Sequence, residues 1–257
     1  MLQHYTKITL LLLILIIGGC SSKKPDDITP KEAVTLLPQT LTIESFYEKT
    51  PTNLAFVWQD TIITSYTITS INANKDTDFV RTYDFTRNSQ NLIQTKKYTY
   101  QGADYPDGSS TYEYHYNEDG TEMSLPDHQT WLYNSNGQLI KYYSGNPNNA
   151  FYSYDYDNSG QLTRFRNKDG SRDITYSMSS FTSVVNPLYL LAEKTQFLAL
   201  GYPNEIVTLF CSKMIPRSFI FSGIPNYVDY SLDEHKRVNA ITVTYNGNVL
   251  NKFTFGY

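Results

Sequence analysis

The residues of this chain that most resemble a metal site lie between Asp155 and Arg166. Residues 155–162 match the first eight positions of an EF-hand loop, which binds calcium through oxygen ligands at fixed spacing. The twelfth position of an EF-hand supplies a bidentate glutamate, and Arg166 occupies that position here. The residues on either side are patterned as strands and not as helices. We therefore expect a hairpin turn in this segment and predict no metal-binding residue.

Other residues with catalytic or ligating chemistry are scattered along the chain. His115, Asp119 and His128 do not stand at the spacing of metal ligands, so we expect them to be surface residues. The sequence contains no Gly-x-Ser-x-Gly elbow, no phosphate-binding glycine loop and no His-Glu-x-x-His motif. It therefore predicts no catalytic residue, no cofactor and no enzymatic activity. One enzymatic alternative stays open, because a glycosidase needs only two carboxylates and can assemble them from distant strands.

Cysteine usage and charge exclude further classes of function. Cys20 and Cys211 are the only two cysteines, and residues 15–20 indicate that Cys20 carries a lipid. Cys211 is then the only thiol, so a disulfide within the chain and a metal site of paired cysteines are excluded. Cys211 ends the apolar run 206–211, and we expect it to be a small buried side chain. The net charge of −4 argues against nucleic acid as a partner, since phosphate binding needs a basic surface.

The first residues are typical of an exported precursor. Lys7 precedes the apolar run Ile8–Ile17, which is too short for a membrane-spanning helix of about 20 residues. Residues 15–20 then resemble a bacterial lipobox, whose cysteine is lipid-modified and becomes the first residue of the mature protein. This resemblance implies a lipoprotein signal peptide at residues 1–19 and lipid attachment at Cys20. An ordinary signal peptide that is cut near Cys20 is the alternative.

Residues 20–40 are expected to form a lipidated tether. The segment Ser21–Asp27 is polar and charged, as in a flexible linker, and a capping box at Thr29 predicts a short helix that ends near Leu37. Lys24 and the aspartates that follow it resemble the signal that sends lipoproteins of Bacteroidetes-type bacteria to the outer face of the outer membrane. These features imply an outer-membrane lipoprotein whose domain lies on the periplasmic or the cell-surface face.

From residue 41 onward the chain is patterned as antiparallel strands. In the hairpin Phe151–Gly170, Tyr152, Tyr154 and Tyr156 alternate with polar residues before a turn that ends at Gly160. The 23 tyrosines and many threonines suit a pleated, half-buried surface. The other predicted strands are Leu54–Gln59, Thr61–Ile71, Phe79–Thr86, Leu92–Gln101, Thr111–Asn117, Gln129–Asn134, Gln138–Ser144, Ile206–Ser212, Arg217–Ser222, Asn226–Leu232, Val238–Tyr245 and Val249–Gly256. Without a linker-like stretch beyond the tether, residues 41–257 are predicted to form a single antiparallel β domain.

One segment interrupts the strand pattern. Asn186 is a good N-cap residue, Pro187 suits the first position of a helix, and Gly201 suits its end. Apolar residues recur between them at helical spacing. We therefore predict one helix at about 187–200, with its apolar face covering an end or a face of the sheet.

These features together resemble an uncharacterised lipoprotein family of the Bacteroidetes. The likeness is carried by the aromatic hairpins, the helix after Asn186, the Lys213–Pro216 segment, the Tyr230–Thr244 hairpin and the lipobox. It implies a porin-like, barrel-shaped antiparallel fold and carries no known activity. The hairpins are also similar to the tyrosine-aspartate repeats of large secreted shell proteins. The predicted fold class is mainly β, an antiparallel β-meander that forms a barrel-like or strongly curved sheet.

A barrel-shaped sheet does not by itself imply insertion into a membrane. A transmembrane barrel needs an apolar outward face in every strand. The positions between the tyrosines instead hold Glu113, His115, Ser153 and Asp155. The sequence therefore predicts a soluble domain on a lipid anchor.

The aromatic face of the hairpins carries the functional hypothesis. Most of these rings are expected to be core, because together they exceed the area of a typical exposed apolar patch. Trp131, Tyr133 and Tyr154 form a hypothetical ligand-binding subset on which sugar rings or an apolar ligand could stack. The predicted function is a non-catalytic binding module for carbohydrate or another envelope ligand, with the membrane and a glycan or an envelope protein as partners. The alternative is an envelope scaffold or assembly protein with no small-molecule ligand.

Overall fold

Antiparallel strands account for most of the chain that the computed structural model describes. The described residues are 37–46, 50–71, 77–102, 105–148, 150–195, 209–221 and 223–257. They belong to one unit, Thr35–Tyr257. Cys20, the proposed tether and the helix predicted between Thr29 and Leu37 lie outside the described residues.

The predicted fold class is confirmed. Seventeen strands form one large antiparallel sheet, and β14 and β15 form a separate pair. The strands are β1 (Thr40–Ser45), β2 (Thr52–Gln59), β3 (Ile62–Ile71), β4 (Thr77–Arg87), β5 (Ile93–Gly102), β6 (Tyr105–Glu113), β7 (His115–Tyr116), β8 (Glu122–Ser124), β9 (Gln129–Tyr133), β10 (Leu139–Ser144), β11 (Ala150–Tyr156), β12 (Leu162–Asp169), β13 (Arg172–Met178), β14 (Phe181–Val185), β15 (Met214–Pro216), β16 (Ser218–Phe221), β17 (Ile224–Leu232), β18 (Val238–Tyr245) and β19 (Asn248–Gly256). One helix, α3 (Pro187–Thr195), lies between β14 and β15 in the sequence.

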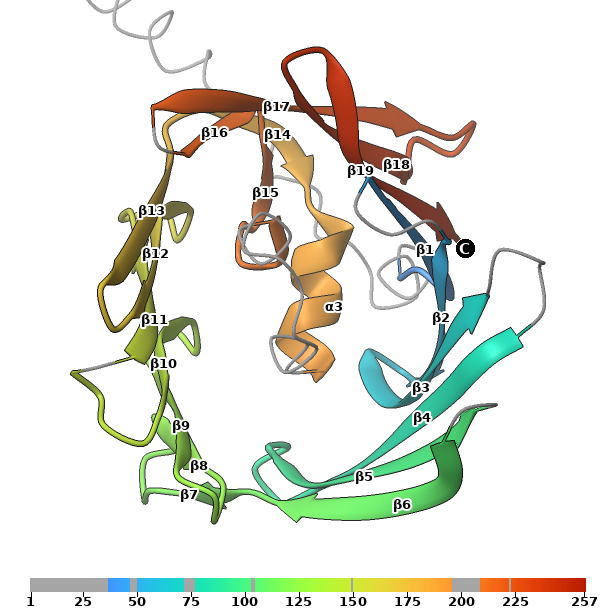
Figure 1. The fold of residues 1–257 in the computed structure, drawn as a ribbon, viewed down its shortest axis with the longest axis vertical. Coiled ribbons are helices and arrows are strands. Elements are labelled where there is room, and N and C mark those ends of the chain that lie inside the picture. The colour runs from blue at the N-terminus through green and yellow to red at the C-terminus, as the bar shows by residue number, and fades with distance from the viewer. Residues whose placement is uncertain are drawn as a thin grey trace, which may run out of the picture. The chain divides into compact units, whose positions relative to one another are not determined.

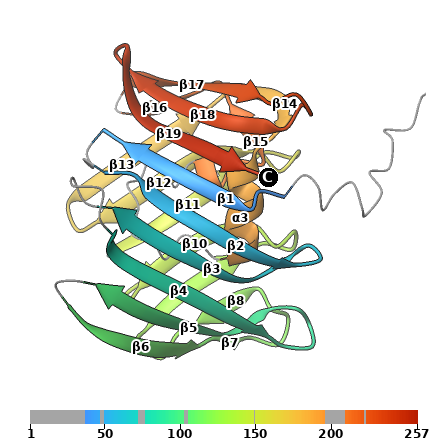
Figure 2. The same ribbon diagram turned by 90° about the vertical axis from the view of Figure 1, so that its right-hand side faces the viewer.

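The large sheet curls into a nearly closed barrel (Figure 1). Its first strand lies between the last and the second, because β1 pairs Thr40 with Gly256 of β19 and with Ala55 of β2. Farther along the sheet, Tyr114 separates β6 from β7. β6 pairs with β5, and β7 pairs with β8. Figure 1 shows α3 and β15 within the ring of strands, and Figure 2 shows β1 to β6 side by side and tilted.

A recurring turn explains why neighbouring strands form hairpins. At 157–160, Oδ1 of Asp157 accepts hydrogen bonds from the N–H groups of Ser159 and Gln161, both at 2.9 Å. Gly160 closes the turn at φ 79°, which favours a residue without a side chain. The turns that begin at Asn88, Asn134 and Asp233 have the same two bonds from the side chain of their first residue. An Asn or Asp followed three residues later by a residue that tolerates positive φ therefore specifies these turns.

Aromatic side chains meet across the inward face of the barrel. Tyr66 and Tyr83 are direct cross-strand partners whose ring centroids lie 4.7 Å apart, and Tyr142 and Tyr152 are partners at 5.6 Å. We call the whole set the inner aromatic row, and its members are Phe56, Tyr66, Tyr83, Tyr98, Tyr112, Trp131, Tyr142, Tyr152, Phe165, Tyr176 and Phe221. Such cross-strand aromatic pairs stabilise a sheet.

The predicted helix begins as expected. Oδ1 of Asn186 accepts from the N–H of Leu188 at 3.0 Å, which is the bond of an N-cap. The amide of Asn186 also donates to the carbonyl oxygens of Leu209 and Ser212, at 2.7 and 2.9 Å. Leu188 and Leu191 are fully buried. The helix thus packs its apolar side inside the barrel, while residues 196–200 of the predicted helix lie outside the described residues.

The predicted strand Ile206–Ser212 is wrong over its described part. Leu209 and Phe210 are helical and Cys211 lies in a turn. The carbonyl oxygen of Leu209 accepts from the amide of Asn186, 23 residues away, and from the N–H of Ser212. That oxygen is therefore not available to a neighbouring strand. The predicted burial of Cys211 is confirmed, and burial raises the pKa of its thiol.

Two further differences concern the strands. The predicted strand Thr111–Asn117 is interrupted at Tyr114, whose N–H donates to the carbonyl oxygen of Gln94. The strands β1, β8, β13, β14 and β15 were not predicted. Two of them, β8 and β15, have only three residues, which is too few for a pattern of period two.

Among the described residues, no helix is long and apolar enough to span a membrane.

Candidate functional site

A groove lies where two hairpins separate. β10 and β11 pair only between Lys141–Tyr143 and Phe151–Ser153. Beyond these residues, Nε2 of Gln138 donates to the carbonyl oxygen of Gly160 at 2.9 Å and joins the two turns. The groove has a volume of about 680 Å³. It is lined by Leu132, Asn134, Asn136, Gln138, Ile140, Lys141, Tyr154, Asp155, Tyr156, Asp157 and Asn158.

The lining of the groove is mainly polar. Four amide side chains and two carboxylates contribute, together with Lys141 and with Ile140, which is 37% exposed. Nζ of Lys141 lies 4.8 Å from the ring centroid of Phe151, so a positive charge stands at one edge. Amides offer donors and acceptors at once, which suits a ligand with several hydroxyl groups.

Both carboxylates of the groove have partners within the protein. Asp155 forms an ion pair with Arg164. Oδ1 of Asp157 accepts from the hydroxyl of Ser159 at 2.7 Å and from two backbone N–H groups of its turn. The Ser159 hydroxyl and the N–H of Gln161 hold the pKa of Asp157 below its ordinary value. A carboxylate held in its ionised form can accept hydrogen bonds from a ligand but is a poor proton donor.

The three aromatic residues predicted to bind a ligand face the interior. Trp131 and Tyr154 are each 3% exposed, and Tyr133 is half-buried. The ring of Trp131 contacts Tyr142 at 5.1 Å and Tyr114 at 6.1 Å. Of the three, Tyr154 also lines the groove. The structure therefore places Trp131 in the inner aromatic row, and ligand binding by these residues stays a prediction.

No sequence pattern groups the polar residues of the groove. Asn134, Asn136 and Gln138 belong to a turn, and Lys141 follows on the next strand. The pairing of β10 with β11 ends early, and this brings two turns to one groove. No residue pattern in the sequence indicates where that pairing ends.

The residues weighed as metal ligands belong to turns and exposed strands. Oδ1 of Asp119 accepts from the hydroxyl of Thr121 at 2.6 Å and from its N–H at 3.0 Å. His115 and His128 are exposed. Within the described ranges, no three His, Cys, Asp or Glu side chains are grouped so that they could hold a metal ion.

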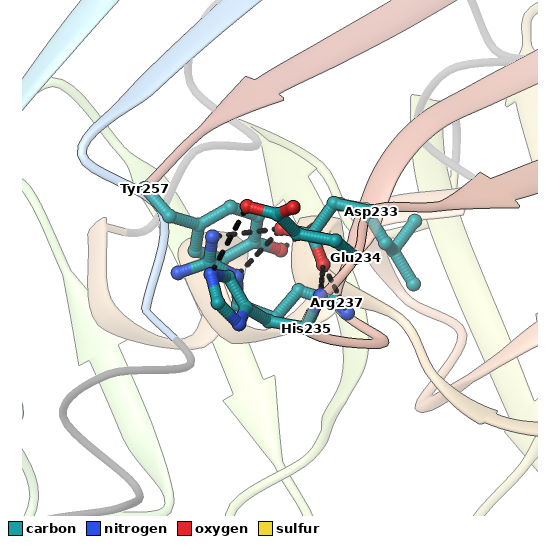
Figure 3. A network of polar contacts seen from close by, with 6 residues as sticks. Asp233, Glu234, His235, Arg237 and Tyr257 are labelled. Carbon is teal, nitrogen blue, oxygen red and sulfur yellow. Dashed lines mark hydrogen bonds and ion pairs between the residues drawn. The ribbon is translucent and has the colours of Figure 1, made fainter.

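A polar network near the end of the chain has a structural explanation. Arg237 forms an ion pair of 2.7 Å with Asp233, and its guanidinium lies 4.5 Å from the ring centroid of Tyr257. The hydroxyl of Tyr257 donates to the carbonyl oxygen of Val238 at 3.0 Å. Figure 3 shows these side chains beside Glu234 and His235. The network fixes the turn between β17 and β18 against the last residue.

Comparison with known proteins shows no family for this chain. No protein-family model and no curated protein matches this chain. A porin-like protein from Bacteroides uniformis is similar over 85% of this chain and 96% of its own, with 12% identity and a TM-score of 0.42. A porin-like protein from Bacteroides vulgatus is similar over 86% and 98%, with 12% identity and a TM-score of 0.39. The predicted lipoprotein family therefore stays a prediction.

A third similar structure is much larger. The structure of TcdB2-TccC3-TEV matches 80% of this chain but only 11% of its own chain, with 8% identity and a TM-score of 0.25. At these values neither this likeness nor the two porin-like ones carries an argument about function. The function is therefore inferred from the geometry of the groove.

Proposed function

We propose that this protein is a non-catalytic binding module for carbohydrate or another envelope ligand, and that the groove over β9, β10 and β11 is its site. The observation that carries the proposal is the groove itself, with a volume of about 680 Å³ and a lining of amides and carboxylates. This volume is within the usual range for small-molecule sites, about 300–1,000 Å³. Hydroxyl groups of a sugar would meet donors and acceptors along the whole groove.

The arrangement favours binding over hydrolysis. A glycosidase needs one carboxyl group that is protonated at working pH and can protonate the leaving oxygen. Asp157 is held ionised by the hydrogen bonds of its turn, and Asp155 is paired with Arg164. Both can act as acceptors for sugar hydroxyls. Ile140 adds an apolar contact for the faces of sugar rings, which carry C–H groups.

Removal of two amides should abolish most of the binding without harm to the fold. Asn136 and Asn158 line the groove, and both are exposed. We expect the double variant Asn136→Ala, Asn158→Ala to bind a glycan about tenfold more weakly, because two hydrogen bonds are lost. The measurement is a glycan array with the full chain in detergent, followed by calorimetric titration of the strongest hit.

The chain offers a matched control for this experiment. The turn 88–91 has the same side-chain bonds as the turn 134–137 and lies outside the groove. The variant Ser89→Ala, Gln90→Ala should bind the same glycan as the wild type does. Equal binding by both double variants would overturn the groove as the site, and a wild type that binds no glycan on the array would overturn carbohydrate as the ligand.

We also propose that the domain is tethered to the outer membrane through a lipid on Cys20. The outward side chains of the barrel support a tether over insertion, since Thr67, Thr82 and Thr99 of three neighbouring strands lie outward in one row. A membrane-spanning barrel carries apolar side chains in such rows. Replacement of Cys20 with alanine should release the protein from the membrane fraction into the soluble fraction. Retention of Cys20→Ala in washed membranes would contradict the tether.

The second candidate is an envelope scaffold. Ile220 of β16 and Tyr227 of β17 are exposed on the outward side of one hairpin. Exposed apolar side chains of this kind can mark a protein contact. Chemical cross-linking in intact cells separates the two candidates, because a scaffold would give a specific adduct that Tyr227→Ser removes while glycan binding is unchanged.

A further inference from the structure

Lys96 is a buried cation on the inward face of the barrel. It lies on β5, where its cross-strand partners are Phe85 of β4 and Tyr112 of β6. Its side chain is 8% exposed. Nζ lies 5.3 Å from the ring centroid of Tyr112 and 5.7 Å from that of Tyr114. A lysine thus occupies a place in the sheet that is otherwise surrounded by aromatic rings.

No carboxylate of the described residues compensates this charge. Asp84 stands opposite Lys97, one residue along, and so faces outward together with it. Glu113 is exposed and alternates with the inward Tyr112 and Tyr114. Among the described side chains, none forms a hydrogen bond or an ion pair with Lys96. A buried ammonium without a counter-charge is costly, and burial lowers the pKa of Lys96 to about 8.

Solvent reaches the rings beside Lys96 even though they face inward. Tyr112 is 36% exposed, and Tyr98, which stacks on it at 5.9 Å, is only partly buried. Part of the surface of these two rings is therefore not covered by other side chains and borders open space. A flat ligand that entered it would contact aromatic faces and would lie next to the ammonium. Burial, and to a smaller extent the negative charge of the exposed Asp127, raise the pKa of Tyr112 and of Tyr114.

We propose that Lys96, Tyr98, Tyr112 and Tyr114 form an interior site for an organic anion with a planar apolar body. The ammonium supplies the counter-charge for a carboxylate or sulfonate, and the tyrosine rings supply stacking surface. In the absence of a ligand, the two rings beside Nζ partly compensate its charge through cation–π contacts. This site faces the interior from β5 and β6 and is separate from the groove over β9, β10 and β11.

The test uses one anionic and one neutral probe. Anilinonaphthalene sulfonate carries a planar body and a sulfonate, and N-phenyl-1-naphthylamine has a similar body without charge. We expect the full chain to bind both with saturable fluorescence. Lys96→Met should weaken binding of the sulfonate by about tenfold or more, because a charge-assisted contact is lost. Binding of the neutral probe should remain.

The matched control is the next residue. Lys97→Met removes an exposed lysine that faces outward, so its affinity for both probes should equal that of the wild type. Equal affinity of Lys96→Met and the wild type for the sulfonate would overturn the proposal. The proposal would also be overturned if Lys96→Met lost binding of both probes while its melting curve stayed cooperative. Lys96 would then shape the cavity without acting as the counter-charge of an anion.

A second measurement tests the site in the wild type, in case Lys96→Met does not fold. Reductive methylation with carbon-13 formaldehyde labels the lysine amines, and comparison with Lys96→Arg identifies the signal of Lys96. Saturation of the wild type with anilinonaphthalene sulfonate should shift that signal and leave that of Lys97 unchanged. An unshifted Lys96 signal at saturation would overturn the interior site.

Discussion

Trp131→Ala is expected to lower the free energy of unfolding by about 3–5 kcal/mol, the usual cost of truncating a buried aromatic residue. The ring is 3% exposed and contacts Tyr114 and Tyr142. Its cross-strand partner on β8, Met123, is fully buried. Burial of about 150–250 Å² at about 25 cal/mol per Å² gives a similar magnitude. Urea denaturation of the full chain, followed by tyrosine fluorescence, measures the change.

Leu132→Ala provides the control for this substitution. Leu132 is the next residue on β9, faces the outer groove and is only partly buried. Its truncation should cost less than about 1 kcal/mol, as surface substitutions usually do. An equally small loss for Trp131→Ala would contradict its place in the inner aromatic row and would favour a ring that is free to stack on a ligand.

Lys96→Met is expected to raise the free energy of unfolding at pH 7 by up to about 3 kcal/mol, the amount that corresponds to its pKa shift. The pKa of Lys96 is about 8 in the folded protein. In the unfolded chain an ordinary lysine has a pKa of about 10.4. Below pH 8 both states are protonated, and the full cost of burying the charge is present. An apolar side chain of similar length removes that cost.

The pH dependence of the wild type follows from the same shift. Between about pH 8 and pH 10 the folded state releases the proton of Lys96 while the unfolded state keeps it, so stability rises with pH. Above about pH 10 the opposite applies to buried tyrosines such as Tyr257, whose pKa burial raises to about 12. The buried thiol of Cys211, whose pKa burial also raises, lowers stability in both proteins above about pH 8.5. The contribution of Lys96 should therefore appear as a difference between Lys96→Met and the wild type that narrows from about pH 8 to pH 10. Urea titrations of both proteins from pH 6 to pH 11 check this, and a difference that does not change with pH would contradict the assignment to Lys96.

The strands and turns that the sequence predicted correctly depend on local patterns. Tyr152, Tyr154 and Tyr156 alternate with polar residues, and this period of two is the same whatever the strand pairs with. The turn at Asp157 is specified by hydrogen bonds within five residues. Asn186 likewise caps α3 through Leu188, two residues away. Elements that are determined by residues close together in the sequence could therefore be predicted.

The parts that were missed depend on distant partners. β14 pairs with β15, so Val185 meets Met214 across a long separation in the sequence. The groove depends on where the pairing of β10 with β11 ends, and no residue pattern indicates that position. Lys96 and Lys97 look alike in the sequence, and only the register of β5 against β4 and β6 decides which of them is buried. A shift of register by one residue would exchange their environments.

The pairing of β1 with β19 has a consequence for how the chain folds. Most hairpins in this barrel join strands that are neighbours in sequence and can form as soon as both strands exist, since short loops close at little entropic cost. β1 must instead wait for the last strand to be synthesised before its second edge is satisfied. Until then an open strand edge is available to any other unpaired strand. Nascent and truncated chains that end before Asn248 would therefore depend on a chaperone to stay apart from one another.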